Sequence, residues 1–227
     1  MAAAGRKGRR LLALLISIAI CGATALTAAT SDTLQDLTTT GGTLQIGDKI
    51  FSNFSFLENG LTSFDSSKIQ VTVSVANGVD YLTWDGNMSL VSGSGTGPVT
   101  ADLLLKYSVT ATSGAIDAID ASYTGSVQPA GGAFVAIDET ARDANGNVVG
   151  STHLDGQDKS DTFSINSPQS SLAVTKDITF GISNGGLASA SEVIQSFHQL
   201  AIPEPSTLSL LTGGAMIATA FFLRRRR

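Results

Sequence analysis

Apolar and polar residues alternate through most of the chain between residues 30 and 201. The period of two is clearest in the runs 69–75, 103–109 and 172–182. Successive side chains of a β-strand point to opposite faces of the sheet, so this pattern predicts strands with one buried face. Lys176 interrupts the apolar face of the third run. We expect this lysine at a sheet edge, where an inward charge discourages pairing with another strand.

Tight turns are predicted between these runs. Asparagine–glycine and aspartate–glycine pairs favour the positive φ angles of hairpins. They occur at residues 59–60, 77–78, 85–86, 145–146, 155–156 and 184–185. Short helical turns fit residues 33–39 and 189–197, although the second segment also fits a strand. The sequence has no amphipathic helices of the length that a parallel sheet needs between its strands.

The fold class that follows is all-β: an antiparallel β-sandwich of the jelly-roll-like or Ig-like kind. We assign it to one exported domain, residues 30–201, which is long enough for a single core. A turn is predicted at Gly47-Asp48. It leads into a strand whose phenylalanines, from Phe51 to Phe56, contribute to the core.

The C-terminal end consists of three parts in order. Pro203-Glu204-Pro205 comes first, and the residue before each proline is held extended. Residues 206–223 carry no charge, and as a helix they would reach about 27 Å, close to the thickness of a bilayer core. The chain closes on a basic stub of Arg224, Arg225, Arg226 and Arg227. Arginine clusters stay on the cytoplasmic side, so we predict a transmembrane helix at 206–223 and a basic tail at 224–227; a buried terminal helix is the alternative.

Residues 202–227 resemble the PEP-CTERM sorting signal of bacterial exported proteins, in which these three parts occur in the same order. The resemblance implies that an exosortase, a membrane protease or transpeptidase, reads Pro203, Glu204 and Pro205. These residues would be the substrate of that enzyme and not catalytic residues of this chain. Residues 47–56 also resemble a motif near the N-terminus of other PEP-CTERM proteins of unknown function. That second likeness implies no activity.

Residues 1–29 are predicted to be a secretory signal peptide. A basic region from Arg6 to Arg10 precedes an apolar stretch from Leu11 to Ile20. Ala23-Thr24-Ala25 and Thr27-Ala28-Ala29 offer cleavage sites of small residues. We expect the Sec translocon and signal peptidase as partners. Lipidation of Cys21 is disfavoured, because Ile20 stands where a lipoprotein signal needs a small residue.

The charge balance changes once the two ends are set aside. Eight of the 14 lysines and arginines lie in the ends, so six remain against 19 acidic residues, Glu204 included. A body this acidic does not bind nucleic acid by neutralising phosphates. The one cysteine, Cys21, falls in the signal peptide, so the predicted mature body has no disulfide.

Candidate chemistry in the body is sparse. The two histidines, His153 and His198, are far apart in sequence, and we expect both at surface or edge positions. Asp138-Glu139 and the acids at 155, 158 and 161 could pair as carboxylates, but loop acids on a solvated hairpin are the simpler interpretation. The spacing of Asp143, Asn145 and Asn147 resembles half of a calcium loop. The glycine is displaced and the final glutamate is missing, so a β-turn is the alternative.

We therefore expect a non-enzymatic, cofactor-free protein of the cell envelope or extracellular matrix, membrane-anchored first and then processed at its C-terminal signal. The alternative is a carbohydrate-binding or adhesive β-sandwich, whose partner would be extracellular polysaccharide. Its aromatic candidates are Tyr81, Trp84, Tyr107 and Tyr123. A hydrolase built on Asp138 or Glu139 has the least support.

Overall fold

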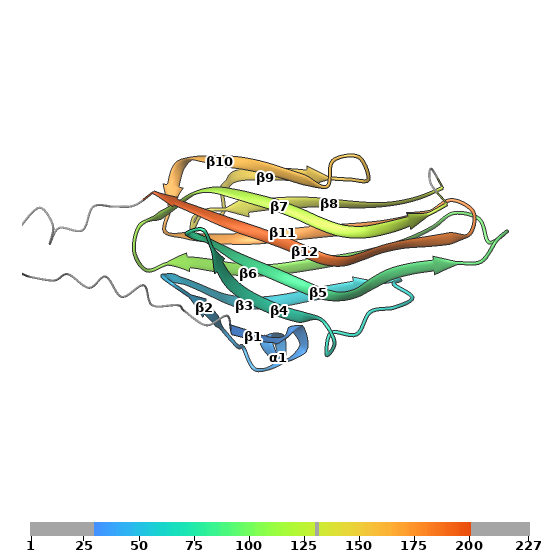
Figure 1. The fold of residues 1–227 in the computed structure, drawn as a ribbon, viewed down its shortest axis with the longest axis horizontal. Helices are drawn as coiled ribbons and strands as arrows, with labels where there is room; N and C mark the ends of the chain where they lie inside the picture. Colours follow the sequence, from blue (N-terminus) through green and yellow to red (C-terminus); the bar gives the residue numbers. More distant parts are fainter. Residues whose placement is uncertain (1–29, 130–131, 201–227) are drawn as a thin grey trace, which may run out of the picture.

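A computed structural model describes residues 30–129 and 132–200, and these residues form a sandwich of two six-stranded sheets. The first sheet contains, in spatial order, β1 (Thr30–Thr33), β4 (Gln70–Ala76), β5 (Val79–Ser92), β12 (Gly186–Leu200), β7 (Ala115–Gln128) and β10 (Ser160–Gln169). The second sheet contains β2 (Leu44–Ile46), β3 (Lys49–Asn59), β6 (Val99–Ala111), β11 (Ser171–Ile182), β8 (Ala133–Arg142) and β9 (Val148–Leu154). The predicted antiparallel β-sandwich is confirmed. Figure 1 shows the long strands running along the longest axis, with α1 at one edge and β9 and β10 at the other.

The strands from β5 to β12 pair in a nested order. β5 pairs with β12, β6 with β11, β7 with β10 and β8 with β9, each antiparallel. Along the chain, each pair lies within the one named before it, so β6 and β11 fall between β5 and β12, and β8 and β9 are innermost. This stretch is therefore one long antiparallel hairpin, and its successive strand pairs belong alternately to the first and the second sheet.

The alternating runs supply the core between the sheets. In β11, residues 172, 174, 178 and 180 are buried, as the period of two predicts. Lys176 occupies an inward position of the same strand and is also fully buried. β11 lies between β6 and β8, so the expectation of an edge position for Lys176 is wrong. A buried partner, described below, makes this inward charge possible in a central strand.

Aromatic side chains fill part of the core between the two sheets. The rings of Trp84 and Tyr107 lie 5.3 Å apart between centroids, and those of Phe51 and Phe197 lie at the same distance. All four side chains are almost completely buried. Trp84 and Phe197 come from the first sheet, and Tyr107 and Phe51 come from the second. The aromatic cluster therefore joins the two layers.

Most predicted turns are present where the sequence places them. Asn77 and Gly78 both have positive φ and connect β4 to β5 in the two-residue hairpin expected of such a pair. Gly146 and Gly185 also have positive φ and lie in turns. Asp85-Gly86 is an exception, because it lies inside β5 opposite a register shift in β12. Gly86 there serves a β-bulge and not a turn.

The predicted helical turn at residues 33–39 is confirmed as α1 (Leu34–Thr39). Thr33 caps it by accepting a hydrogen bond from the Asp36 N–H at 3.1 Å. Leu34 and Leu37 bury the inner face of the helix. Residues 189–197 belong to β12, so the strand alternative holds there and the helical one is wrong. Within the described residues, no helix has both the length and the apolar character needed to cross a bilayer.

Candidate functional site

The predicted sorting residues Pro203, Glu204 and Pro205 and the basic tail from Arg224 to Arg227 lie outside the described residues, as do the predicted signal peptide and transmembrane helix. The structure does describe the strand that leads to this signal. β12 ends at Leu200, three residues before Pro203.

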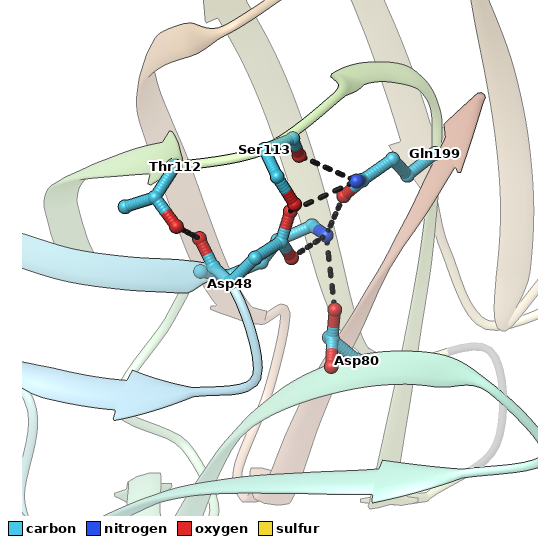
Figure 2. Close-up of polar contacts among 6 residues, drawn as sticks. Asp48, Asp80, Thr112, Ser113 and Gln199 are labelled. Carbon is cyan, nitrogen blue, oxygen red and sulfur yellow. Dashed lines mark hydrogen bonds and ion pairs between the residues drawn. The ribbon is translucent and has the colours of Figure 1, made fainter. Parts of the chain in front are cut away.

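A polar cluster holds the end of β12 against the rest of the sandwich (Figure 2). We call Asp48, Lys49, Asp80, Ser113 and Gln199 the strand-end cluster. The Lys49 ammonium donates to Asp80 at 2.9 Å and to Asp48 at 3.1 Å, and it also contacts the Gln199 carbonyl oxygen. The Gln199 amide nitrogen donates to Asp48 at 2.8 Å and to the Ser113 carbonyl oxygen at 2.6 Å.

The local sequence explains why these groups meet. Gly47 has a φ of 56°, and the turn that it forms brings Asp48 beside the loop that follows β6. Lys49 takes an inward position at the start of β3 and is 1% exposed. Asp80 is also inward on β5, in the opposite sheet. The cluster borders a hollow of about 230 Å³ and ties the end of β12 to residues of both sheets.

Burial alone would raise the pKa of Asp48. The hydrogen bond from Gln199 and the bond and charge of Lys49 outweigh burial, so the net pKa lies below its ordinary value of 3.8. The carboxylate form is therefore the one that the cluster is built to hold.

A second group of polar residues crosses the outer face of the first sheet. Tyr81, Ser196, Asp120 and Thr162 are register neighbours on β5, β12, β7 and β10, and we call them the outer-face row. They line a hollow of about 320 Å³. Tyr81 is half-buried there, with its ring available at the surface.

His198 lies beside Ser196 and Asp120 of the outer-face row, so a serine, a histidine and an aspartate meet here. Asp120 Oδ2 accepts from Ser196 Oγ at 2.8 Å and lies 2.6 Å from His198 Nε2. In a hydrolytic triad the imidazole stands between the other two groups and uses a different nitrogen for each. Here the same nitrogen faces both partners, and Ser196 gives its hydrogen to the carboxylate. The arrangement binds the strands together and does not activate a nucleophile.

Burial would raise the pKa of Asp120, but hydrogen bonds from His198, Thr162 and Ser196 lower it to a net value below 3.8. The row therefore carries a negative charge at neutral pH. His198 lies on the central strand β12 and not at a sheet edge, but its side chain is partly exposed, in line with the surface alternative expected for it.

A third group lies inside the core. Tyr107, Glu139, Lys176 and Gln195 form what we call the buried network, and none of them is more than 2% exposed. Glu139 accepts from Lys176 with one carboxylate oxygen and from Gln195 with the other. The Tyr107 hydroxyl donates to the Gln195 carbonyl oxygen. Burial raises the pKa of Tyr107 well above 10, and the Glu139 charge adds to this effect, so the hydroxyl remains protonated.

The carboxylates singled out in the sequence separate from one another. Asp138 and Glu139 lie in β8 and not in a loop, and they point to opposite faces of it, as successive strand residues do. Glu139 is in the core, whereas Asp138 is exposed and lies 2.8 Å from His153 Nδ1. His153 is on the edge strand β9, as expected, and the hydrogen bond from Asp138 raises its pKa.

The calcium candidates lie in the turn between β8 and β9. Asp143 Oδ1 accepts from the backbone N–H groups of Asn145 and Asn147, both at 2.9 Å. Asp143 Oδ2 accepts from the Asn147 side chain at 3.0 Å. These contacts match the β-turn alternative. Within residues 30–129 and 132–200, histidine, cysteine and acidic side chains form no group of three that could hold a metal ion.

The aromatic candidates for ligand binding are mostly internal. Trp84, Tyr107 and Tyr123 are between 1% and 6% exposed, so these three candidates do not form an exposed binding face. Tyr81 alone of the four is at the surface, because it alternates with the inward Leu82 and Asp80. The sequence contains this information, because Tyr81 and Trp84 are an odd number of residues apart in one strand and therefore point to opposite faces of the sheet.

Sequence reasoning also missed the role of Gln195 and Lys49. Both stand at inward positions of strands whose neighbours are apolar, which is the same signal that marked Lys176. The pairing of Lys176 with Glu139 needs the register of β8 on β11, and no single strand contains that information.

Comparisons with known proteins give weak likenesses. No protein family and no curated protein matches the chain. A glycosylation-associated protein complex from Streptococcus agalactiae is 12% identical, with a TM-score of 0.29, over 70% of this chain and 27% of that one. A carbohydrate-binding module in complex with beta-1,4-galactotriose is 13% identical, with a TM-score of 0.27, over 63% and 87%. A family 29 carbohydrate-binding module is 12% identical, with a TM-score of 0.19, over 74% and 92%. These scores are too low to carry an argument about this chain.

Proposed function

We propose that this chain is an exported, non-enzymatic protein of the cell envelope or extracellular matrix. In this proposal the signal peptide at 1–29 directs export through the Sec translocon, and the helix at 206–223 anchors the chain in the membrane. An exosortase then reads Pro203-Glu204-Pro205 and processes the chain there. The observation that carries the proposal is the order of three sorting elements within residues 202–227.

The strand-end cluster supports this proposal. A processing enzyme needs an extended peptide that is separate from the folded body, and we expect Pro203 and Pro205 to favour extended geometry at the residue before each of them. The cluster fastens Gln199 to three residues of two other segments, Asp48, Lys49 and Ser113, so we expect β12 to stay in the folded body while the enzyme acts on the chain beyond Leu200. The nested strand pairing also fits the jelly-roll alternative of the expected sandwich.

The test replaces Pro203, Glu204 and Pro205 together by alanine in the full chain. We expect the variant to stay in the membrane fraction with its C-terminus intact, whereas the parent chain loses its C-terminal segment. Fractionation and mass spectrometry of both ends of the mature protein measure this. Pro98→Ala, in the exposed loop after β5, is the matched control and should behave as the parent does. Identical processing of the parent and the triple variant would refute the proposal.

A second function, binding of a neutral glycan, is favoured by the outer-face row. Its hollow combines the surface ring of Tyr81 with the Asp120 carboxylate and serine and threonine hydroxyls. An aromatic ring packs against the apolar face of a sugar, and the polar groups accept and donate hydrogen bonds to its hydroxyls. The negative charge of Asp120 and Asp161 disfavours anionic sugars at this place.

Binding to an array of immobilised neutral oligosaccharides tests this second function. Tyr81→Ala should weaken binding by about tenfold or more if the ring is a central contact. Thr72→Ala, on the neighbouring strand β4 and not among the residues that line the hollow, is the control that should bind normally. Trp84→Ala is unsuitable because it empties the core. Absence of binding, or equal binding by Tyr81→Ala, would remove this function.

A further inference from the structure

The buried network joins the two sheets through side chains. Gln195 belongs to β12 of the first sheet, whereas Lys176, Glu139 and Tyr107 belong to β11, β8 and β6 of the second. Lys176 and Glu139 are direct neighbours in register. The Lys176 amine and the Gln195 amide therefore meet on the two oxygens of a single carboxylate.

The surroundings of the network are apolar. Lys176 Nζ lies 5.8 Å from the centre of the Trp84 ring, and the Phe51 ring packs against those of Tyr107 and Phe197. A dry site strengthens the effect of each polar group on its neighbour and keeps water from competing in a reaction. The site thus holds a primary amine, a carboxamide, a proton carrier and a hydroxyl donor without solvent.

We propose that Lys176 and Gln195 react to form an isopeptide bond, a side-chain amide that covalently links the two sheets. Lys176 Nζ is the nucleophile and Gln195 Cδ is the electrophile. Glu139 carries protons from the amine to the leaving group. The Tyr107 hydroxyl donates to the Gln195 oxygen, where negative charge develops.

The step is balanced with the groups present. Glu139 takes a proton from the Lys176 ammonium, and the neutral amine forms a bond to Gln195 Cδ while the carbonyl electrons move to Oε1. Tyr107 stabilises that oxygen. Glu139 returns its proton to Gln195 Nε2 and takes another from Nζ. The carbonyl re-forms, the bond from Cδ to Nε2 breaks, and the released ammonia leaves as ammonium with the proton from Glu139.

Lys49 gives an internal contrast. It is also buried, and Asp48 bridges its ammonium to the Gln199 amide nitrogen, but here the Lys49 ammonium itself donates to the Gln199 carbonyl oxygen. Gln199 Nε2 donates to Asp48 and to the Ser113 carbonyl, and no tyrosine hydroxyl reaches its oxygen among the contacts described for this cluster. The strand-end cluster therefore differs from the buried network in the donor to the amide oxygen, which is the lysine itself and not a separate hydroxyl that could stabilise the developing charge.

A covalent link at this place would supply what the body lacks. The only cysteine precedes the described residues, so no disulfide can tie the two sheets together. Lys176 and Gln195 lie on consecutive strands, one in each sheet. The bond would close a short loop through β11, the turn and β12. Because it is covalent, it would hold Lys176 and Gln195 together even when the chain is unfolded.

Mass spectrometry of the exported protein as isolated tests the proposal. Digestion of the denatured protein after glutamate cuts at Glu192, between the two reacting residues. We expect the peptides that contain Lys176 and Gln195 to remain joined, with a combined mass lower by one ammonia. Two separate peptides of unmodified mass would overturn the proposal. A joined pair that has lost one water and contains Glu139 would place the bond on Glu139, which also overturns it.

Variants assign the roles. Lys176→Met and Glu139→Gln should give separate peptides, and Tyr107→Phe, which keeps the ring, should slow formation of the link by about tenfold or more. Lys49→Met is the matched control and should keep the link. If the first two variants do not fold, the unaltered chain and Tyr107→Phe still decide the matter. An equal rate of linkage in Tyr107→Phe would contradict the oxyanion role.

Discussion

At the residue scale, two backbones approach each other closely at Gly125. A methyl group added there would lie 2.1 Å from the Ser189 carbonyl oxygen on β12. Gly125 pairs with Ala190 next to the register shift in that strand, so the β-bulge brings the backbone of β12 toward β7. Because the neighbour is backbone and not the end of a flexible side chain, it cannot move aside without displacing the strand.

We expect Gly125→Ala to lower the free energy of unfolding by about 1–3 kcal/mol, the usual cost of overpacking. Urea unfolding followed by tryptophan fluorescence measures this, because Trp84 is buried in the same sheet. Gly156→Ala is the control, since an added methyl there meets nothing within 4 Å. If Gly125→Ala loses no more stability than the control, the backbone of β12 can shift to accommodate the added methyl group.

Single residues show what could be predicted from the sequence. The inward parity of Trp84 was readable from its alternation with Tyr81, yet a lone tryptophan invites interpretation as a binding residue. Lys176 was correctly placed on the apolar face. Its partner could not be found, because Glu139 lies 37 residues away in sequence and meets it only through the register of β8 on β11.

At the element scale, β12 has the most central position. It lies between β5 and β7 in its sheet, contributes Gln195 to the core and ends in the strand-end cluster. Its sequence has weak alternation and allowed a helical interpretation of residues 189–197. The pairing partners on both sides, and not local propensity, decide that this segment is a strand. The strongly alternating β6 and β11 needed no such context.

The strand-end cluster predicts a dependence of stability on acid. Asp48 has a folded pKa below its ordinary value of 3.8, so its contribution is fully present above that value. The contribution is lost as the pH falls through the lowered folded pKa. We expect Asp48→Asn to be less stable than the parent at pH 6 and to lose less stability between pH 6 and pH 3.

Urea midpoints at the two pH values measure this difference. The control is Asp65→Asn, whose carboxylate pairs with the exposed Lys68 on the surface, where ion pairs contribute little. Asp65→Asn should resemble the parent at pH 6. If acidification from pH 6 to pH 3 lowers the stability of the parent and of Asp48→Asn by the same amount, protonation of Asp48 does not contribute to the loss.

At the scale of the whole molecule, the described body is strongly acidic. All acidic residues except Glu204 lie within residues 30–200, giving 18 acidic against six basic residues. Three carboxylates meet on the outer face of the second sheet, where burial and the charges of Asp102 and Asp138 raise the pKa of Asp177. The fold therefore forms against repulsion among its own charges.

Screening should relieve this repulsion. The Debye length falls from about 30 Å at 0.01 M salt to about 10 Å at 0.1 M, so repulsion between distant surface carboxylates is largely screened. We expect the melting temperature of the body, residues 30–200, to rise by a few degrees over this range of sodium chloride, because like-charge repulsion outweighs the few surface ion pairs. Asp177→Asn removes one repelling charge, so it should melt higher at low salt and respond less to added salt. A melting temperature that falls with salt would mean that attractive pairs, led by the buried lysines, dominate the electrostatics of the whole molecule.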